Sequence, residues 1–177
     1  MELVNNKEAR QIRLELINSL RKAVIETDKE KEHLEAAKYW YEKYQKEHKK
    51  DYEIVKEIDV LEGTARYFDI AVNVRSTIGM NASKEAVYQK YQELMEKDYA
   101  LNFDRVDGLA DSESYDLGGA AGILLEKNSK DKSWQKEAEN GIPLVETLLK
   151  DVKAVPQQPS QEIKNLMKEI EEKRKNL

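Results

Sequence analysis

The feature that most constrains the fold is the spacing of apolar residues, which recur at steps of three and four along most of the chain. The runs 6–27, 51–74 and 161–177 show this helical period. Only seven Gly and three Pro interrupt the 177 residues, and alternating apolar and polar runs, as in strands, are few. The sequence therefore predicts an all-α fold, a multi-helix bundle of six to eight helices with long antiparallel helices near the N-terminus.

A stretch with two prolines near the C-terminus divides the chain. Residues 155–160 break the helical pattern and are interpreted as a linker. They separate a helical bundle domain over residues 1–154 from a C-terminal amphipathic helix over residues 161–177. This last helix is expected either to dock on the bundle or to act as a contact arm.

The longest apolar pattern belongs to the helix predicted for residues 51–74. Its apolar residues follow one another at alternating steps of four and three, and we expect the stripe to be buried. The stripe consists of Ile54, Ile58, Leu61, Ala65, Phe68 and Val72. A polar line runs beside it and marks either the edge of a core or the wall of a cleft. This line consists of Asp59, Glu62, Arg66, Asp69 and Asn73.

Small residues mark a second helix, predicted for residues 115–127. Gly118, Gly119 and Gly122 each cost about 1 kcal/mol of helix stability relative to Ala, so we expect another backbone to pack closely against them. This helix is expected at the centre of the bundle. The longest irregular stretch precedes it, at residues 98–114, and loops of this length are often functional.

Composition excludes several function classes. The net charge of −5 argues against a general nucleic-acid surface, because phosphate binding requires a positive field. The chain has no cysteine, and therefore no disulfide framework, thiolate metal site or cysteine nucleophile. No apolar run is long enough to span a membrane, and no signal segment follows Met1. The sequence predicts a soluble chain and leaves its compartment open.

Catalytic patterns are scarce. His33 and His48 are 15 residues apart on a charged helix, over about 20 Å along its axis, and both are interpreted as surface residues. No His-Glu-x-x-His, P-loop or Gly-x-Ser-x-Gly pattern occurs. Residues 104–111 resemble a calcium loop only faintly, because the Asp-x-Asp rhythm and the closing Glu are absent.

One short motif is left, Glu-Gly-Thr-Ala-Arg-Tyr at residues 62–67, in the middle of the helix 51–74. The carboxylate of Glu62 is a suitable oxygen ligand for zinc, and Gly63 permits a neighbouring helix to approach. Arg66, one turn further on, is placed to hold a carboxylate oxygen. A simpler interpretation is also open: Glu62 and Arg66 form an ordinary surface pair, and Gly63 is a packing position.

The motif resembles the second motif, Glu-Gly-x-Ala-x-Tyr, of an uncharacterised bacterial family of zincin-like putative metallopeptidases of the glutamate-zincin type. Shorter pieces over most of residues 8–152 are similar to that family, among them Ala37-Lys-Tyr-Trp40 and Ser114-Tyr115-x-x-Gly118. The resemblance implies that Glu62 is the third zinc ligand, with Arg66 and Tyr67 in support. The His-Glu-x-x-His motif of the family is absent from this chain.

Two functions follow as expectations. In the first, the chain is the C-terminal portion of such a metallopeptidase, inactive alone, with zinc bound only in a full-length protein that supplies the histidine helix. Its partner is then an upstream helical segment or a second copy, and an exposed apolar strip should adjoin Glu62. In the second, the chain is a non-enzymatic helical module for binding or scaffolding. The sequence identifies no substrate.

Overall fold

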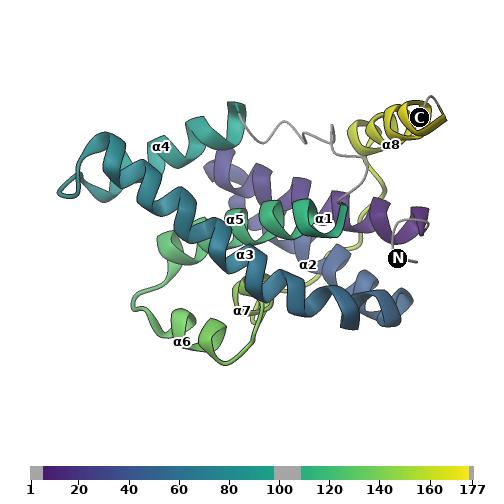
Figure 1. The fold of residues 1–177 in the computed structure, drawn as a ribbon, viewed down its shortest axis with the longest axis horizontal. Coiled ribbons are helices and arrows are strands. Elements are labelled where there is room, and N and C mark those ends of the chain that lie inside the picture. Colours follow the sequence, from purple (N-terminus) through teal and green to yellow (C-terminus); the bar gives the residue numbers. More distant parts are fainter. Residues whose placement is uncertain (1–5, 98–108, 176–177) are drawn as a thin grey trace.

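The computed structural model describes residues 6–97 and 109–175, and every regular element within them is helical (Figure 1). The elements are α1 (Lys7–Ile25), a short 3-10 helix η2 (Thr27–Lys29), α2 (Glu30–Glu47), α3 (Lys49–Ile78), α4 (Lys84–Lys97), α5 (Leu109–Asn128), α6 (Ser133–Glu139), α7 (Leu144–Leu149) and α8 (Gln161–Lys175). The all-α prediction is confirmed, and the eight α-helices in these ranges agree with the expected six to eight.

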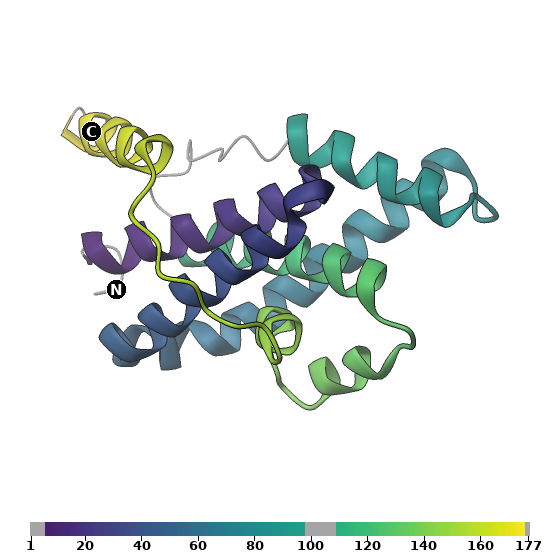
Figure 2. The same ribbon diagram turned by 180° about the vertical axis from the view of Figure 1, so that it is seen from behind.

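The N-terminal helices α1 and α2 form the predicted antiparallel pair, because η2 reverses the chain between them (Figure 2). The side-chain oxygen of Asn6 accepts a hydrogen bond from the Ala9 backbone N–H at 3.2 Å and so caps α1. Both helices bury the sides that carry their apolar residues. The buried residues include Ile12, Leu16, Leu20 and Val24 of α1 and Ala37, Trp40, Tyr41 and Tyr44 of α2.

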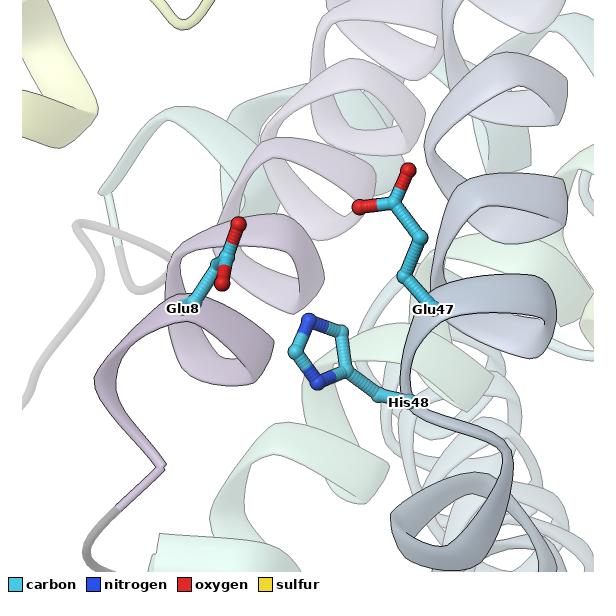
Figure 3. A group of neighbouring side chains, drawn as sticks. All are labelled: Glu8, Glu47 and His48. Carbon is cyan, nitrogen blue, oxygen red and sulfur yellow. The ribbon is translucent and has the colours of Figure 1, made fainter.

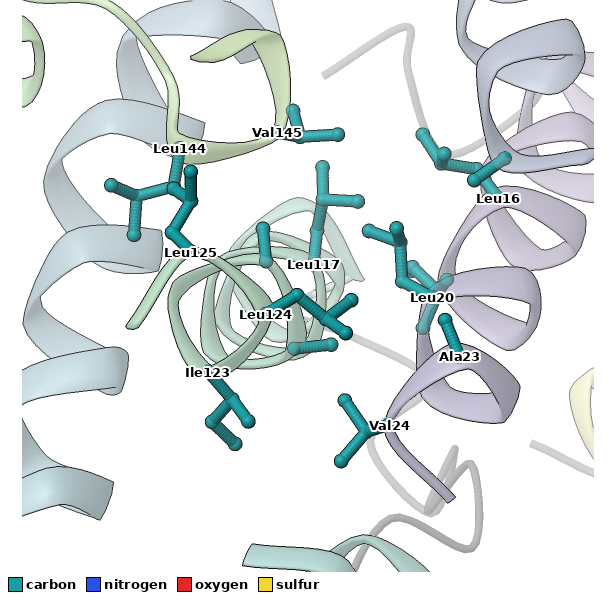
Figure 4. Close-up of a cluster of buried hydrophobic side chains, with 14 of the residues drawn as sticks. Leu16, Leu20, Ala23, Val24, Leu117, Ile123, Leu124, Leu125, Leu144 and Val145 are labelled. Carbon is teal, nitrogen blue, oxygen red and sulfur yellow. The ribbon is translucent and has the colours of Figure 1, made fainter. Parts of the chain in front are cut away.

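Helix α5 runs through the middle of the bundle, between α1 on one side and α3 on the other (Figure 4). A Cβ on Gly63 of α3 would lie 3.0 Å from the Cα of Gly118, and a Cβ on Gly118 would overlap the Gly63 backbone. Gly122 gives the same room to the ring of Tyr67. The predicted close packing of this small-residue helix is therefore confirmed, and α3 is the backbone that approaches it.

The prediction for the buried face of α3 is wrong, because the apolar stripe lies on the opposite, outer face. Leu61 is 70% exposed, Val72 66% and Phe68 48%. We call this stripe the outer strip; it consists of Ile54, Ile58, Leu61, Ala65, Phe68 and Val72. The face against α5 carries Tyr52, Val55, Asp59, Gly63, Tyr67, Ile70, Ala71 and Val74. The physical reason is backbone contact: only the side with Gly63 lets α3 approach α5 so closely.

Helix α5 also begins earlier than expected. It starts at Leu109, so residues 109–114 are helical and the predicted irregular stretch 98–114 is too long at its C-terminal end. Residues 98–108 lie outside the described residues, and with them most of the calcium-like sequence. No helix in the described ranges combines the length and the apolar content that crossing a bilayer requires.

The C-terminal helix α8 docks on the bundle rather than extending away from it. Its residues Ile163, Met167 and Ile170 form a small buried cluster with Leu14 of α1. The extended chain before it is held by Glu15, whose carboxylate accepts a hydrogen bond from the Ser160 backbone N–H at 2.6 Å. The stretch interpreted as a linker therefore lies against α1 at its end.

Candidate functional site

The Glu62 motif sits in the middle of α3, and its members leave the helix on different sides. Glu62 and Arg66 are half-buried, and Arg66 donates to the Asp69 carboxylate at 2.8 Å. Tyr67 is only 4% exposed, and its hydroxyl donates to Glu126 of α5 at 2.9 Å. Five residues of helix separate the Cβ directions of Glu62 and Tyr67 by about 140°. The structure thus brings Arg66 to the Glu62 flank and turns Tyr67 towards α5.

Glu62 borders the outer strip on this flank. Helical geometry places it about 80° around α3 from the middle of the strip, while Gly63 lies on the far side. An exposed apolar strip beside Glu62 is the arrangement that the zincin-like hypothesis requires. The strip itself is the largest exposed apolar feature of the described residues, since it holds four of the six large apolar side chains that are strongly exposed.

Behind the opposite face of α3 lies a buried network of charges. Arg13 of α1 binds both oxygens of Asp59, at 2.8 and 3.1 Å, and donates through Nε to Glu113 at 3.0 Å. Ser114 donates to the same Asp59 at 2.6 Å, and Arg10 lies 2.9 Å from Glu113. All five side chains are almost fully buried. The network therefore ties α1, α3 and α5 together and fixes how α3 is rotated.

Burial and ion pairing shift the pKa values of the groups in this network in opposite directions. Burial favours the neutral form of Glu113 and raises its pKa above the ordinary value, although Arg10 and Arg13 lower it. Burial alone would lower the pKa of Arg13, but Asp59 and Glu113 raise it above its usual range. Arg13 is thus held as a cation between two carboxyl groups. These charges support the fold, and no exposed surface is offered to a substrate.

Sequence reasoning missed most of this network. The sequence pattern places Asp59 in a polar line of α3 and gives no role to Arg13 or Glu113. The available signal was the position of the two arginines, three residues apart and within the apolar side of α1. Charged residues at such positions require buried partners. The partners of Arg13, however, are Asp59 and Glu113, which lie 46 and 100 residues further along the chain.

A second polar cluster is centred on Glu126 of α5. The hydroxyls of Tyr67 and Tyr91 donate to its carboxylate at 2.9 and 2.8 Å, and Arg75 forms an ion pair with it. Burial, with the nearby Glu126 carboxylate, raises the pKa of both tyrosines above their ordinary range. The tyrosines therefore act as hydrogen-bond donors, and the cluster links α3, α4 and α5.

The cluster around Glu126 lies between two clefts and lines both of them. The larger, of about 570 Å³, lies beside the C-terminal half of α3 and is lined by Phe68, Val72 and Trp134 with several lysines. The smaller, of about 470 Å³, lies between α4 and α5 and includes Tyr88 and Lys127. Because the larger cleft shares Phe68 and Val72 with the outer strip, the strip and this cleft form one continuous surface.

The structure also assembles one group of three potential metal ligands among the described residues. Glu8 of α1, Glu47 at the end of α2 and His48 between α2 and α3 bring their ligand atoms within 4.8 Å of one another (Figure 3). Both glutamates are exposed and His48 is half-buried, so His48 is not the plain surface residue that the sequence predicts. Sequence spacing gave no signal for this group, because Glu8 lies 39 residues before Glu47.

The hydrogen bonds of His48 disfavour a metal at this group. The amide oxygen of Asn6 accepts from the Ala9 backbone, so its amide nitrogen faces His48 Nδ1 at 3.2 Å. Nδ1 then accepts and the proton lies on Nε2, the nitrogen that points towards the two carboxylates (Figure 3). A metal-binding histidine has the reverse arrangement, with its second nitrogen donating. Lys43 further pairs with Glu47 at 2.8 Å.

Glu62 does not join these ligands. His48 immediately precedes α3, and Glu62 lies 14 residues along the chain, about 21 Å along the helix axis. Within the described residues, the donor set around Glu62 therefore does not fit a zinc ion, which takes four ligands in a tetrahedron.

Comparisons with known proteins return no relative of this chain. No family model matches the sequence, no curated protein matches it, and no solved structure matches the fold. The zincin-like resemblance stays a prediction.

Proposed function

We propose that this chain is a non-enzymatic binding module whose outer strip on α3 docks a helix of another polypeptide. The observation that carries the proposal is the exposure of a continuous apolar seam on a long helix. Ile54, Leu61, Phe68 and Val72 are all strongly exposed, and among the other large apolar side chains of the described residues only Met80 and Val155 are. Exposed apolar patches of several hundred Å² mark interaction sites on soluble proteins.

The spacing of the strip supports a helix as the bound element. Steps of four and three repeat over residues 54–72, which is the a and d pattern of a coiled-coil seam. The seam extends about 27 Å along α3 at 1.5 Å per residue. A partner helix of five turns would cover it, with its own apolar residues inserted between those of α3.

Photo-crosslinking in the source cell tests the proposal. A benzophenone amino acid replaces Leu61 on the outer strip in one version and Ala86 on α4 in a control; both positions are exposed. We expect a discrete crosslinked product, identified by mass spectrometry, from position 61 and none from position 86. The absence of a discrete product at position 61, or equal products at both positions, contradicts the proposal.

A second candidate function is favoured by the place of Glu62 on the flank of the strip. In the zincin-like hypothesis the missing histidine helix packs beside Glu62, and an apolar face next to this residue is what such a helix would cover. Under this proposal the chain as given hydrolyses nothing and supplies one carboxylate ligand, with Arg66 and Tyr67 in support.

Metal analysis tests the second candidate. We expect less than about 0.1 zinc per chain after dialysis against a weak chelator, because one carboxylate without histidines makes no tight site. In a longer version that carries a His-Glu-x-x-His helix, Glu62→Ala should lower the zinc content, and the exposed Glu57→Ala should leave it unchanged. Equal zinc content in both variants would show that Glu62 is not a zinc ligand.

A further inference from the structure

We propose that the occupant of the outer strip is a second copy of this chain, packed with α3 antiparallel to α3 about a two-fold axis near residue 63. This inference rests on the proposed binding function and names its partner. It follows from the register of the strip, from the charges on its two flanks and from its size.

The strip is complementary to itself when one copy is reversed. An antiparallel pair of helices places a positions opposite d positions. Reversal about residue 63 sets Ile54 opposite Val72, Ile58 opposite Phe68, and Leu61 opposite Ala65 of the second copy. Every residue of the strip meets another residue of the strip, so no apolar side chain is left over at either end. The small Ala65 lies next to the axis and leaves room for the larger Leu61 of the second copy.

The flank of the strip that carries the larger cleft has opposite charges at its two ends. Glu53 and Glu57 are exposed on this flank in the N-terminal half of α3, with the exposed Lys50 before them at the start of the helix. In the C-terminal half the cleft has four cationic side chains against two carboxylates. These are Arg75, Lys84, Lys130 and Lys132 against Glu126 and Asp131.

An antiparallel two-fold pairing brings like flanks together and reverses their ends. Glu53 and Glu57 of one copy then lie beside the cationic cleft of the other, twice in the dimer. A parallel pairing would instead set this flank against the opposite one at the same height, and bring Glu57 of one copy near Glu62 of the other. On that opposite flank, the antiparallel pairing places Arg66 near Glu62 of the second copy. The charges therefore favour the antiparallel arrangement.

The size of the strip predicts a weak dimer. Two five-turn helix faces bury on the order of 1,000 Å² in total, near the lower limit for a specific interface. We therefore expect a monomer–dimer equilibrium rather than an obligate dimer, with half dimerisation at roughly 10–100 μM.

Analytical ultracentrifugation of the whole chain from about 1 to 500 μM tests the partner. We expect the dimer fraction to rise with concentration for the wild type and for Val155→Asp, an exposed apolar position away from α3. Leu61→Asp should raise the dissociation constant at least tenfold. A wild type that is monomeric throughout, or a dimer that Leu61→Asp leaves intact, overturns the inference. A monomer whose position 61 crosslinks to a different protein keeps the proposed function and rejects self-association.

Disulfide trapping tests the orientation, because the chain has no native cysteine. We expect Ile54→Cys and Val72→Cys to form a disulfide-linked dimer only when the two variants are mixed and oxidised. Each variant alone should stay unlinked, since an antiparallel pair separates identical positions by about 27 Å. Linkage of each variant to itself indicates parallel pairing and overturns the inference, as does the absence of linkage in the mixture. Circular dichroism confirms that both exposed-site variants fold.

Discussion

The two faces of α3 differ in what holds them. The inner face carries Gly63, Tyr67 and the buried Asp59, and it packs against α5 by backbone contact and a charge network. The outer face carries the outer strip, which is more apolar and yet open to solvent. The inner face is therefore selected by shape and pairing, whereas the outer face has an apolar surface that residues 6–97 and 109–175 do not cover.

This contrast also separates folding from binding. A buried glycine pair and a paired arginine admit one arrangement of α3 and specify its rotation. An open seam of Leu, Ile, Phe and Val adds little to the stability of the monomer, because its side chains gain burial only when a partner arrives. We therefore expect substitutions on the inner face to change stability strongly and those on the outer face to change it little.

The largest effect is expected on breaking the buried charge network. Arg13→Ala leaves Asp59 and Glu113 buried without their shared cation, which should lower the free energy of unfolding by about 3–5 kcal/mol. Arg66→Ala removes a partly exposed ion pair with Asp69 and an attraction to Asp116, and should cost less than about 1 kcal/mol. Urea denaturation followed by circular dichroism compares the two. Equal losses would show that the network does not anchor the inner face.

A somewhat smaller loss is expected from adding one methyl group between α3 and α5. Gly118→Ala overlaps the Gly63 backbone and must push the helices apart, which should cost about 3 kcal/mol, the upper end for overpacking. Ala65→Leu adds more volume on the outer face and should change stability by no more than about 0.5 kcal/mol. Thermal melts of both variants provide the measurement. A stable Gly118→Ala protein would contradict the close contact.

A pH effect of intermediate size is expected at Asp116, half-buried on α5. Burial raises its pKa from 3.8 to about 7; Arg66 opposes the shift and Glu113 adds to it. Between these values the unfolded chain binds fewer protons than the folded one, so stability falls as pH rises from about 4 to 7. Asp116→Asn should therefore match the wild type near pH 4 and exceed it by about 1–2 kcal/mol at pH 8, allowing for partial exposure.

Denaturation midpoints at both pH values test this expectation. A variant that is less stable than the wild type at pH 8 would show that the Asp116 carboxylate is stabilised in the folded protein.

The smallest effect is expected on the outer strip. The double variant Leu61→Ser with Phe68→Ser should lower monomer stability by no more than about 1 kcal/mol in dilute solution, because Leu61 is largely exposed and Phe68 is about half exposed. Ile70→Ser on the inner face, where Ile70 is buried, should cost several times more. A large loss in the double variant would mean that the strip is part of the core.

Periodicity alone predicted much of this fold. The apolar spacing of α1, the rings of α2 and the glycines of α5 each identify a buried side correctly, because on those helices the buried side is also the apolar or small-residue side. On α3 the same reasoning fails, since the seam through Leu61 is more apolar than the side through Gly63. Hydrophobic spacing reports which face is able to be buried and does not report what buries it.

The candidate site was less predictable for a similar reason. The ion pairs of Arg13 and the grouping of Glu8 with His48 join residues far apart in sequence, and no local pattern encodes such distances. Glu62 was identified only through a resemblance, and its place beside an exposed strip follows from the rotation of α3. That rotation is fixed by contacts with α5 which the sequence does not display.

Hydroxyl-radical footprinting of dilute protein tests the central claim most directly, because Tyr67 and Phe68 are sequence neighbours of which the first packs on the inner face of α3 and the second belongs to the outer strip. Phe68 is 48% exposed and Tyr67 is 4% exposed, so residue-level mass spectrometry should find Phe68 oxidised several times faster than Tyr67. Leu61 and Met80, which are also strongly exposed, should likewise be oxidised. Protection of Phe68 together with rapid oxidation of Tyr67, at concentrations where the chain is monomeric, would show that the apolar seam faces inward and would contradict the account.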